Sequence, residues 1–292
     1  MKRVFAAIFL LLFAAALGGC MDIGTVVKVK PDGSGTIEEK AMFSKDAVDM
    51  ITSMEKNMKE SVDKSLKAAK DKAPPSDGPE GTAGEIKKAL SLYDEGKLKA
   101  KAEDFGKGVT YLGSRKLLLE GGEGFEVQYG FPDVNALIIA HRSVDDLGGG
   151  GSGEALRTYA MTFQKGAPSK LIIKVPELSM GRKLFPRSDA PETVSLEKQR
   201  EAFGVFKTLF KGMKLFLAVQ AEGTIVETNA SFSEGNRVVL IDIDVDKMDF
   251  SDEQLEKMNE KKDESYSGLM AALGNTAGFR IEAKNEVWIT IR

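Results

Sequence analysis

The sequence predicts an α+β fold in which antiparallel β-sheet hairpins pack against amphipathic helices. Three observations lead to this prediction. Short runs of alternating apolar and polar residues occur in pairs, and turn residues join the two runs of each pair. Longer segments with apolar residues three and four positions apart lie between these pairs. Strands and helices do not alternate one by one, so the sheet is expected to be antiparallel.

The first half of the chain is expected to contain two hairpins and a long helix. The turn residues PDGSG at 31–35 join the first pair of strands. Ser44 can cap the long helix, and Met54 and Met58 lie on its apolar stripe. The expected elements are strands at 25–30 and 36–43, a helix from 45 to about 72, short helices at 85–93 and 98–105, and strands at 109–119 and 125–131.

The second half is expected to be richer in strands. Gly212 ends a helix that carries three phenylalanines on one face, and residues 251–254 form a capping box that opens another helix. The expected elements are strands at 156–163 and 170–175, a helix at 191–210, three joined strands at 213–220, 224–232 and 237–245, a helix from 251 to near 260, a short helix at 270–273, and a closing hairpin of 279–283 with 286–292.

Residues 1–20 have the composition of an export signal. Lys2 and Arg3 precede an apolar run from Val4 to Leu17 that contains no charged side chain. This run is shorter than the roughly 20 residues that a membrane-spanning helix needs. It ends close to Cys20, which is the only cysteine of the 292 residues. The stretch from Leu17 to Cys20, Leu-Gly-Gly-Cys, resembles the lipobox of bacterial lipoproteins.

The resemblance implies a specific maturation. The thiol of Cys20 would receive a diacylglyceryl group, the peptide bond before it would be cut, and the new amino group would be acylated. Cys20 would then be the first residue of the mature protein and its lipidation site, and two or more acyl chains hold a protein stably on a bilayer. Because Met21 and not an aspartate follows Cys20, the resemblance points to the periplasmic face of the outer membrane of a Gram-negative envelope.

Four segments follow from these patterns. Residues 1–19 are a signal peptide, residues 20–72 an N-terminal hairpin with the long helix, residues 73–84 a flexible linker rich in proline and glycine, and residues 85–292 the main domain. The chain resembles uncharacterised envelope lipoproteins of Gram-negative bacteria. Through the strand, PDGSGTI turn and second strand near its start, it also bears a weak likeness to the LppM type of lipoprotein domain.

The net charge and the numbers of cysteine and histidine residues argue against several kinds of partner and site. Removal of the signal peptide leaves 39 Lys and Arg against 44 Asp and Glu, a net charge of −5, which argues against nucleic acid as a partner. One histidine, His141, and one cysteine cannot form a zinc site of these residues. No G-x-S-x-G motif accompanies His141. We therefore expect no catalytic residues and no cofactor.

The best candidate for a metal site is the stretch DIDVDKMDFSDE. Asp242, Asp244, Asp246 and Glu253 occupy places one, three, five and twelve of a calcium-binding loop. However, Lys247 stands at place six, where the loop needs glycine for its sharp turn. The alternating apolar residues around the aspartates also continue a strand pattern. We therefore expect the aspartates to form the solvent face of a strand and to bind no metal.

Two functions remain open at this point. The first is a membrane-anchored envelope lipoprotein that acts as a non-enzymatic protein-interaction module, held to the membrane by its N-terminal lipid and binding an envelope protein. The alternative is a protein that binds a lipid or an apolar small molecule between its sheet and the helix of Met54 and Met58. An amphipathic helix on a sheet suits both a filled core and a binding groove, so the sequence does not separate them.

Overall fold

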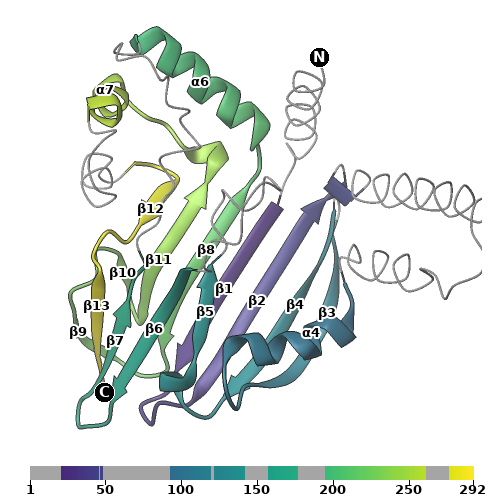
Figure 1. Ribbon diagram of the computed structural model, residues 1–292, viewed down its shortest axis with the longest axis vertical. Helices are drawn as coiled ribbons and strands as arrows, with labels where there is room; N and C mark the ends of the chain where they lie inside the picture. The colour runs from purple at the N-terminus through teal and green to yellow at the C-terminus, as the bar shows by residue number, and fades with distance from the viewer. Residues whose placement is uncertain are drawn as a thin grey trace, which may run out of the picture.

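The computed structural model describes residues 21–45, 47–48, 93–119, 122–141, 157–176, 195–260 and 276–292. Two β-sheets form most of it (Figure 1), with 52% strand against 23% helix. The predicted α+β class with packed amphipathic helices is therefore wrong, and the fold is β-rich. The reason is that each sheet buries its apolar face mainly against the other sheet. An alternating strand pattern indicates a buried face but does not say whether a helix or a sheet covers it.

The larger sheet has eight strands in the order β10-β11-β8-β1-β2-β4-β3, with β12 paired to β11. Its strands are β1 (Met21–Val29), β2 (Gly35–Ser44), β3 (Thr110–Leu119), β4 (Gly122–Phe131), β8 (Lys214–Ala221), β10 (Ser233–Glu234), β11 (Arg237–Asp244) and β12 (Phe279–Ile281). The β1–β2 hairpin lies at the centre of this sheet. β1 runs parallel to β8, whereas the other neighbouring strands are antiparallel.

The smaller sheet has five antiparallel strands in the order β5-β6-β7-β13-β9. In Figure 1 it lies in front of the lower part of the larger sheet. Its strands are β5 (Ile138–His141), β6 (Arg157–Gln164), β7 (Ser169–Lys174), β9 (Ile225–Thr228) and β13 (Glu286–Ile291). The described helices are α4 (Glu95–Ala100), α6 (Leu196–Leu209), α7 (Asp252–Glu260) and the 3-10 turns η1 (Lys101–Phe105), η2 (Val134–Ala136) and η4 (Val245–Lys247).

One apolar core fills the space between the two sheets. Val27 and Ile37 of the larger sheet and Leu171 and Ile289 of the smaller sheet are all fully buried in it. Tyr159 is also fully buried, and its hydroxyl has no hydrogen-bond partner among the described residues. Burial raises the pKa of Tyr159 far above its usual value, so the side chain stays neutral and acts as part of the apolar core.

Several elements predicted from turn and cap residues are confirmed. The hairpins β1–β2, β3–β4 and β6–β7 form as expected. The capping box is present, because the backbone N–H of Gln254 donates to Ser251 Oγ and the N–H of Ser251 donates to Gln254 Oε1. The long helix predicted from 45 to about 72, with Met54 and Met58, and the linker at 73–84 lie outside the described residues except for a few positions up to Val48.

Two predicted strand pairings are wrong, and both involve passage of the chain between the sheets. The strands expected at 213–220, 224–232 and 237–245 do not form one meander, because β9 pairs with β13 in the smaller sheet while β8 pairs directly with β11. The expected closing hairpin of 279–283 with 286–292 also does not form. Its first strand, β12, pairs with β11, and its second strand, β13, pairs with β7.

A buried carboxylate fixes the corner at which the chain changes sheets. Glu282 follows β12 and is completely buried. Its carboxylate accepts hydrogen bonds from the backbone N–H of Ser231 at 2.7 Å, from Ser231 Oγ at 2.8 Å and from the backbone N–H of Lys284 at 3.0 Å. The segment after β9 and the segment before β13 are thereby held together.

The division into an N-terminal segment and a main domain stays a prediction, but the hairpin of the first segment is built into the larger sheet. β1 and β2, from the segment 20–72, are flanked by β8 and β4, from the segment 85–292. No helix within the described ranges is long and apolar enough to span a membrane.

Candidate functional site

The structure places the start of β1 directly after the predicted lipidation site. Cys20 itself lies outside the described residues, and Met21, the next residue, is already the first residue of β1. Met21 pairs with Phe43 of β2, and Asp22 pairs with Lys214 of β8 on the other side. Consecutive Cα atoms are about 3.8 Å apart. A lipid on Cys20 is therefore expected to connect to the centre of the larger sheet without a flexible linker.

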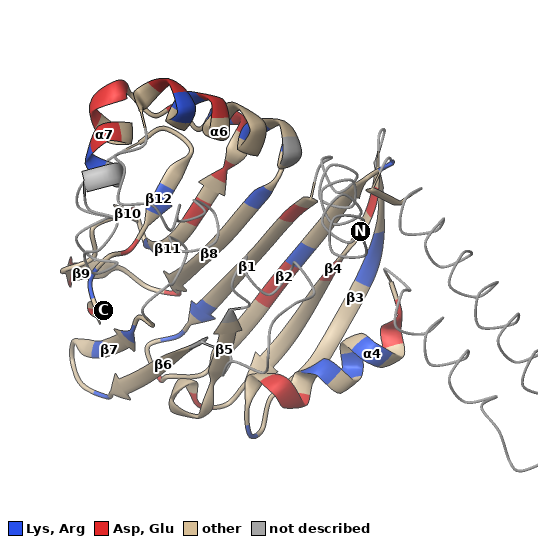
Figure 2. Ribbon diagram, turned by 45° about the horizontal axis from the view of Figure 1, so that its top comes forward, with Lys and Arg blue, Asp and Glu red and all other residues tan. Residues whose placement is uncertain are grey.

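We call the edge formed by these strand ends the anchor end. It consists of the first residues of β1, β4 and β8 and the last residues of β2, β3 and β11. Starts and ends meet at one edge because antiparallel neighbours run in opposite directions. One row of paired residues crosses it from Met21 through Phe43 and Glu123 to Leu118. Leu118 is 72% exposed. Figure 2 shows that acidic and basic residues are interspersed along the strands of the larger sheet.

Asp244 lies at the anchor end, at the last position of β11. It is only 7% exposed, so its predicted place on the solvent face of the strand is wrong. Its Oδ2 lies 3.1 Å from the Nζ of Lys247 and 3.6 Å from the Nζ of Lys214. Burial raises the pKa of Asp244, but the hydrogen bond with Lys247 and the two lysine charges outweigh it, so the pKa lies below the ordinary value of 3.8.

The four residues considered as calcium ligands form separate contacts. Arg280 donates to Asp242, the backbone N–H of Gly212 donates to Asp246, and Lys257 pairs with Glu253. Asp244 pairs with Lys214 and Lys247. Within the described part of the chain, no group of three His, Cys, Asp or Glu side chains has the geometry to hold a metal ion.

Replacement of Asp244 by asparagine is expected to reduce the free energy of unfolding by about 1 kcal/mol at neutral pH, because the two lysine partners are largely solvated. The folded-state pKa is lowered, so this contribution is complete above pH 3.8 and is lost as the pH falls through the folded-state pKa. Chemical denaturation of wild type and variant at pH 7 and at pH 3 measures the difference, which should shrink at the lower pH. A difference in the free energy of unfolding that is the same at both pH values would contradict this account. An increase in the free energy of unfolding of the wild type alone on addition of calcium would contradict it as well.

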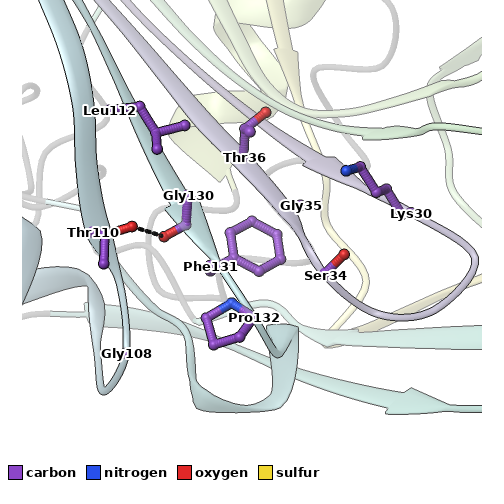
Figure 3. Close-up of a pocket in the computed structure, with 10 residues that line it drawn as sticks. All are labelled: Lys30, Ser34, Gly35, Thr36, Gly108, Thr110, Leu112, Gly130, Phe131 and Pro132. Carbon is purple, nitrogen blue, oxygen red and sulfur yellow. Dashed lines mark hydrogen bonds between the residues drawn. The ribbon is translucent and has the colours of Figure 1, made fainter.

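A hollow of about 460 Å³ lies at the opposite end of the larger sheet. Its floor is a row across three strands in which Gly130 of β4 lies between Thr110 of β3 and Thr36 of β2. Gly130 has no side chain, and the side chain of Leu112 packs over it, because a Cβ atom at position 130 would lie 3.3 Å from Leu112 Cδ2. Figure 3 shows Thr110 and Leu112 on one side of Gly130, and Thr36 on the other side with Lys30 farther out. The hydroxyl of Thr110 donates a hydrogen bond to the carbonyl of Gly130.

The lining of the hollow is partly polar and partly apolar. Its lining combines one ammonium group, three hydroxyls and apolar surface, namely Lys30, Ser34, Thr36, Thr110, Leu112, Phe131 and Pro132, with Gly35, Gly108 and Gly130. Leu112 is 56% exposed at its edge and belongs to the irregular pairing between Tyr111 and Gly113. The glycine within the strand sequence YGF was the only sequence signal for this feature, since such a glycine often marks a bulge or an open surface.

Among the described residues, none of the other candidates from the sequence lines this hollow. His141 is the last residue of β5, and its side chain is outside the described part of the structure. The chain matches no model of a known protein family, no curated protein and no solved structure. The lipoprotein resemblance of residues 17–20 therefore stays a prediction from the sequence.

Proposed function

We propose that this protein is a lipid-anchored lipoprotein of the bacterial cell envelope, on the periplasmic face of the outer membrane, and that its β-rich body binds a protein partner without catalysing a reaction. The observation that carries the proposal is the position of Cys20. A lipobox cysteine lies one residue before the first strand of the folded body. Mature lipoproteins of this kind begin at the cysteine, so cleavage before it leaves all described residues of the β-sheet in the mature protein.

Replacement of Cys20 by serine tests the anchor. A serine hydroxyl does not form the thioether, and the chain has no second cysteine to accept the lipid. The wild-type protein is expected in the membrane fraction, with a mass that shows acylation of residue 20, and the Cys20→Ser protein is expected to lose both. A Cys20→Ser protein that remains in the membrane fraction would contradict the proposal.

The hollow supports the partner-binding part of the proposal. It opens beside β3, which is the last strand of the larger sheet and pairs only with β4 among the described strands. An outer strand can add an extended segment of another protein through backbone hydrogen bonds, and neighbouring pockets then select its side chains. The alternative of a lipid ligand depends on the helix of Met54 and Met58, which is outside the described residues, and no described contact favours it.

A photo-reactive amino acid at position 112 tests this surface in intact cells. We expect one discrete cross-linked protein adduct from position 112, because Leu112 is exposed at the edge of the hollow. Thr110→Trp in the same chain should strongly reduce this adduct, because the indole fills the hollow. The matched control is position 226, an exposed valine on β9 in the smaller sheet. An equally strong adduct from position 226, or an adduct that Thr110→Trp leaves unchanged, would contradict the proposed binding surface.

A further inference from the structure

We infer that the anchor end is a membrane-contact surface, which rests on the bilayer with Leu118 at the level of the lipid headgroups while the strands of the larger sheet point away from the membrane. The inference rests on the acylation of Cys20 proposed above. It adds an orientation and a second contact with the bilayer, which acylation alone does not require, because one attachment point still allows the body to pivot.

The geometry of the sheet brings the anchor end close to the lipid. β1 is the central strand, with β2, β4 and β3 on one side and β8 and β11 on the other. Neighbouring strands lie about 4.8 Å apart, so Leu118 on β3 lies on the order of 15 Å from Met21 across the sheet. Lys214, on the neighbouring strand β8, is closer. Because no linker separates Cys20 from β1, the anchor end remains within about this distance of the bilayer surface.

The side chains at this end suit the membrane interface. Leu118 is the most exposed of the large apolar residues within the described ranges. Its transfer from water into the interface is favourable. Lys211, Lys214 and Lys247 are exposed at the same end, where β8 starts and β11 ends. Long lysine side chains can follow an apolar surface and place their ammonium groups among lipid phosphates.

The face of the larger sheet that points away from the smaller sheet carries ion pairs between neighbouring strands, including Lys28 with Glu38 at 2.6 Å and Arg115 with Glu126 at 2.5 Å. Ion pairs also lie at the anchor end, where Asp244 pairs with Lys214 and Lys247. The attachment at Cys20, and not a difference in ion pairs, therefore selects the anchor end as the membrane side, and the hollow beside Leu112, at the other end of the larger sheet, then faces away from the membrane.

The depth of single labelled positions tests this orientation. The mature chain has no thiol other than that of the lipidated Cys20, so an introduced cysteine is the only free one. Leu118→Cys and Leu112→Cys form a matched pair, because both leucines are exposed on β3, six residues or about 20 Å apart. Each full-length variant is purified in acylated form, labelled with an environment-sensitive fluorophore and placed in phosphatidylethanolamine–phosphatidylglycerol vesicles that contain doxyl-labelled lipid. Lys214→Cys serves as a second position at the anchor end in case Leu118→Cys does not fold.

We expect doxyl lipid to quench the label at positions 118 and 214 several-fold more strongly than the label at position 112. Equal quenching at the two ends of β3, or stronger quenching at position 112, in a protein whose mass shows acylated Cys20 would overturn the orientation and leave the anchor itself intact. A mass that shows an unmodified Cys20 would instead overturn the proposed function, and the orientation with it.

Discussion

Gly35→Ala is expected to destabilise the protein by about 3 to 5 kcal/mol, which is large for the addition of one methyl group. Gly35 is the first residue of β2 and is buried. A Cβ atom at this position would lie 1.9 Å from the backbone carbonyl oxygen of Lys28 and 2.6 Å from the ring of Phe131. The carbonyl oxygen belongs to β1 and cannot rotate away as a flexible side chain can. The central β1–β2 pairing would have to shift to make room.

The matched control is Gly113→Ala in β3 of the same sheet. No atom lies within 4 Å of the position that its Cβ would take. Its effect on the free energy of unfolding is therefore expected to stay within about 0.5 kcal/mol, as for most surface substitutions. Chemical denaturation of both variants and the wild type measures the two values. Similar stabilities for the two variants would show that Gly35 and Lys28 are not in this close contact.

Glu282→Ala is expected to reduce the free energy of unfolding by about 3 to 5 kcal/mol. The change leaves the backbone N–H and the hydroxyl of Ser231 and the backbone N–H of Lys284 without their carboxylate acceptor, and a hydrogen bond to a charged group contributes about 1.5 to 3 kcal/mol. It also leaves a cavity, because Glu282 is completely buried.

Two further variants separate these contributions. Glu282→Gln keeps the shape and one acceptor oxygen, so it is expected to lose less stability than Glu282→Ala. Glu286→Ala removes an exposed acid at the start of β13 and should have little effect. If Glu282→Ala were no less stable than Glu286→Ala in urea denaturation, Glu282 would not hold the corner between the two sheets.

Local features were predictable because neighbouring residues determine them. The turn residues at 31–35 predict the β1–β2 hairpin, and Ser251 with Gln254 predicts the start of α7. Each of these features depends on contacts between residues close in the sequence. The sequence signals for a turn or a cap are therefore complete within a few positions.

The assignment of strands to sheets was not predictable in the same way. Alternation in residues 279–283 and 286–292 indicates which side chains are buried, but not which strand lies beside each. The short segment between β12 and β13 reads as a turn, yet the two strands lie in different sheets, joined at the corner that Glu282 holds. Asp244 was misplaced for a related reason, because the turn η4 brings Lys247 back over the end of β11.

The candidate site was predictable in part. The resemblance of residues 17–20 to a lipobox predicts Cys20 as the lipidation site, but only the structure places its neighbour Met21 in a central strand. The hollow depends on a row of residues from β2, β3 and β4, which are distant in the sequence. A pattern within one strand carries no information about such a row.

The parallel pairing of β1 with β8 determines the order in which the protein can fold. Asp22 pairs with Lys214, so most of the chain must be synthesised before β1 acquires this neighbour. Contacts between residues so far apart form slowly, because a long loop must close first. In the export proposed above, the strand next to Cys20 would therefore keep one side unpaired until residues 214–221 arrive. On that proposal, the delay would leave Cys20 accessible to an acylating enzyme before the sheet is complete.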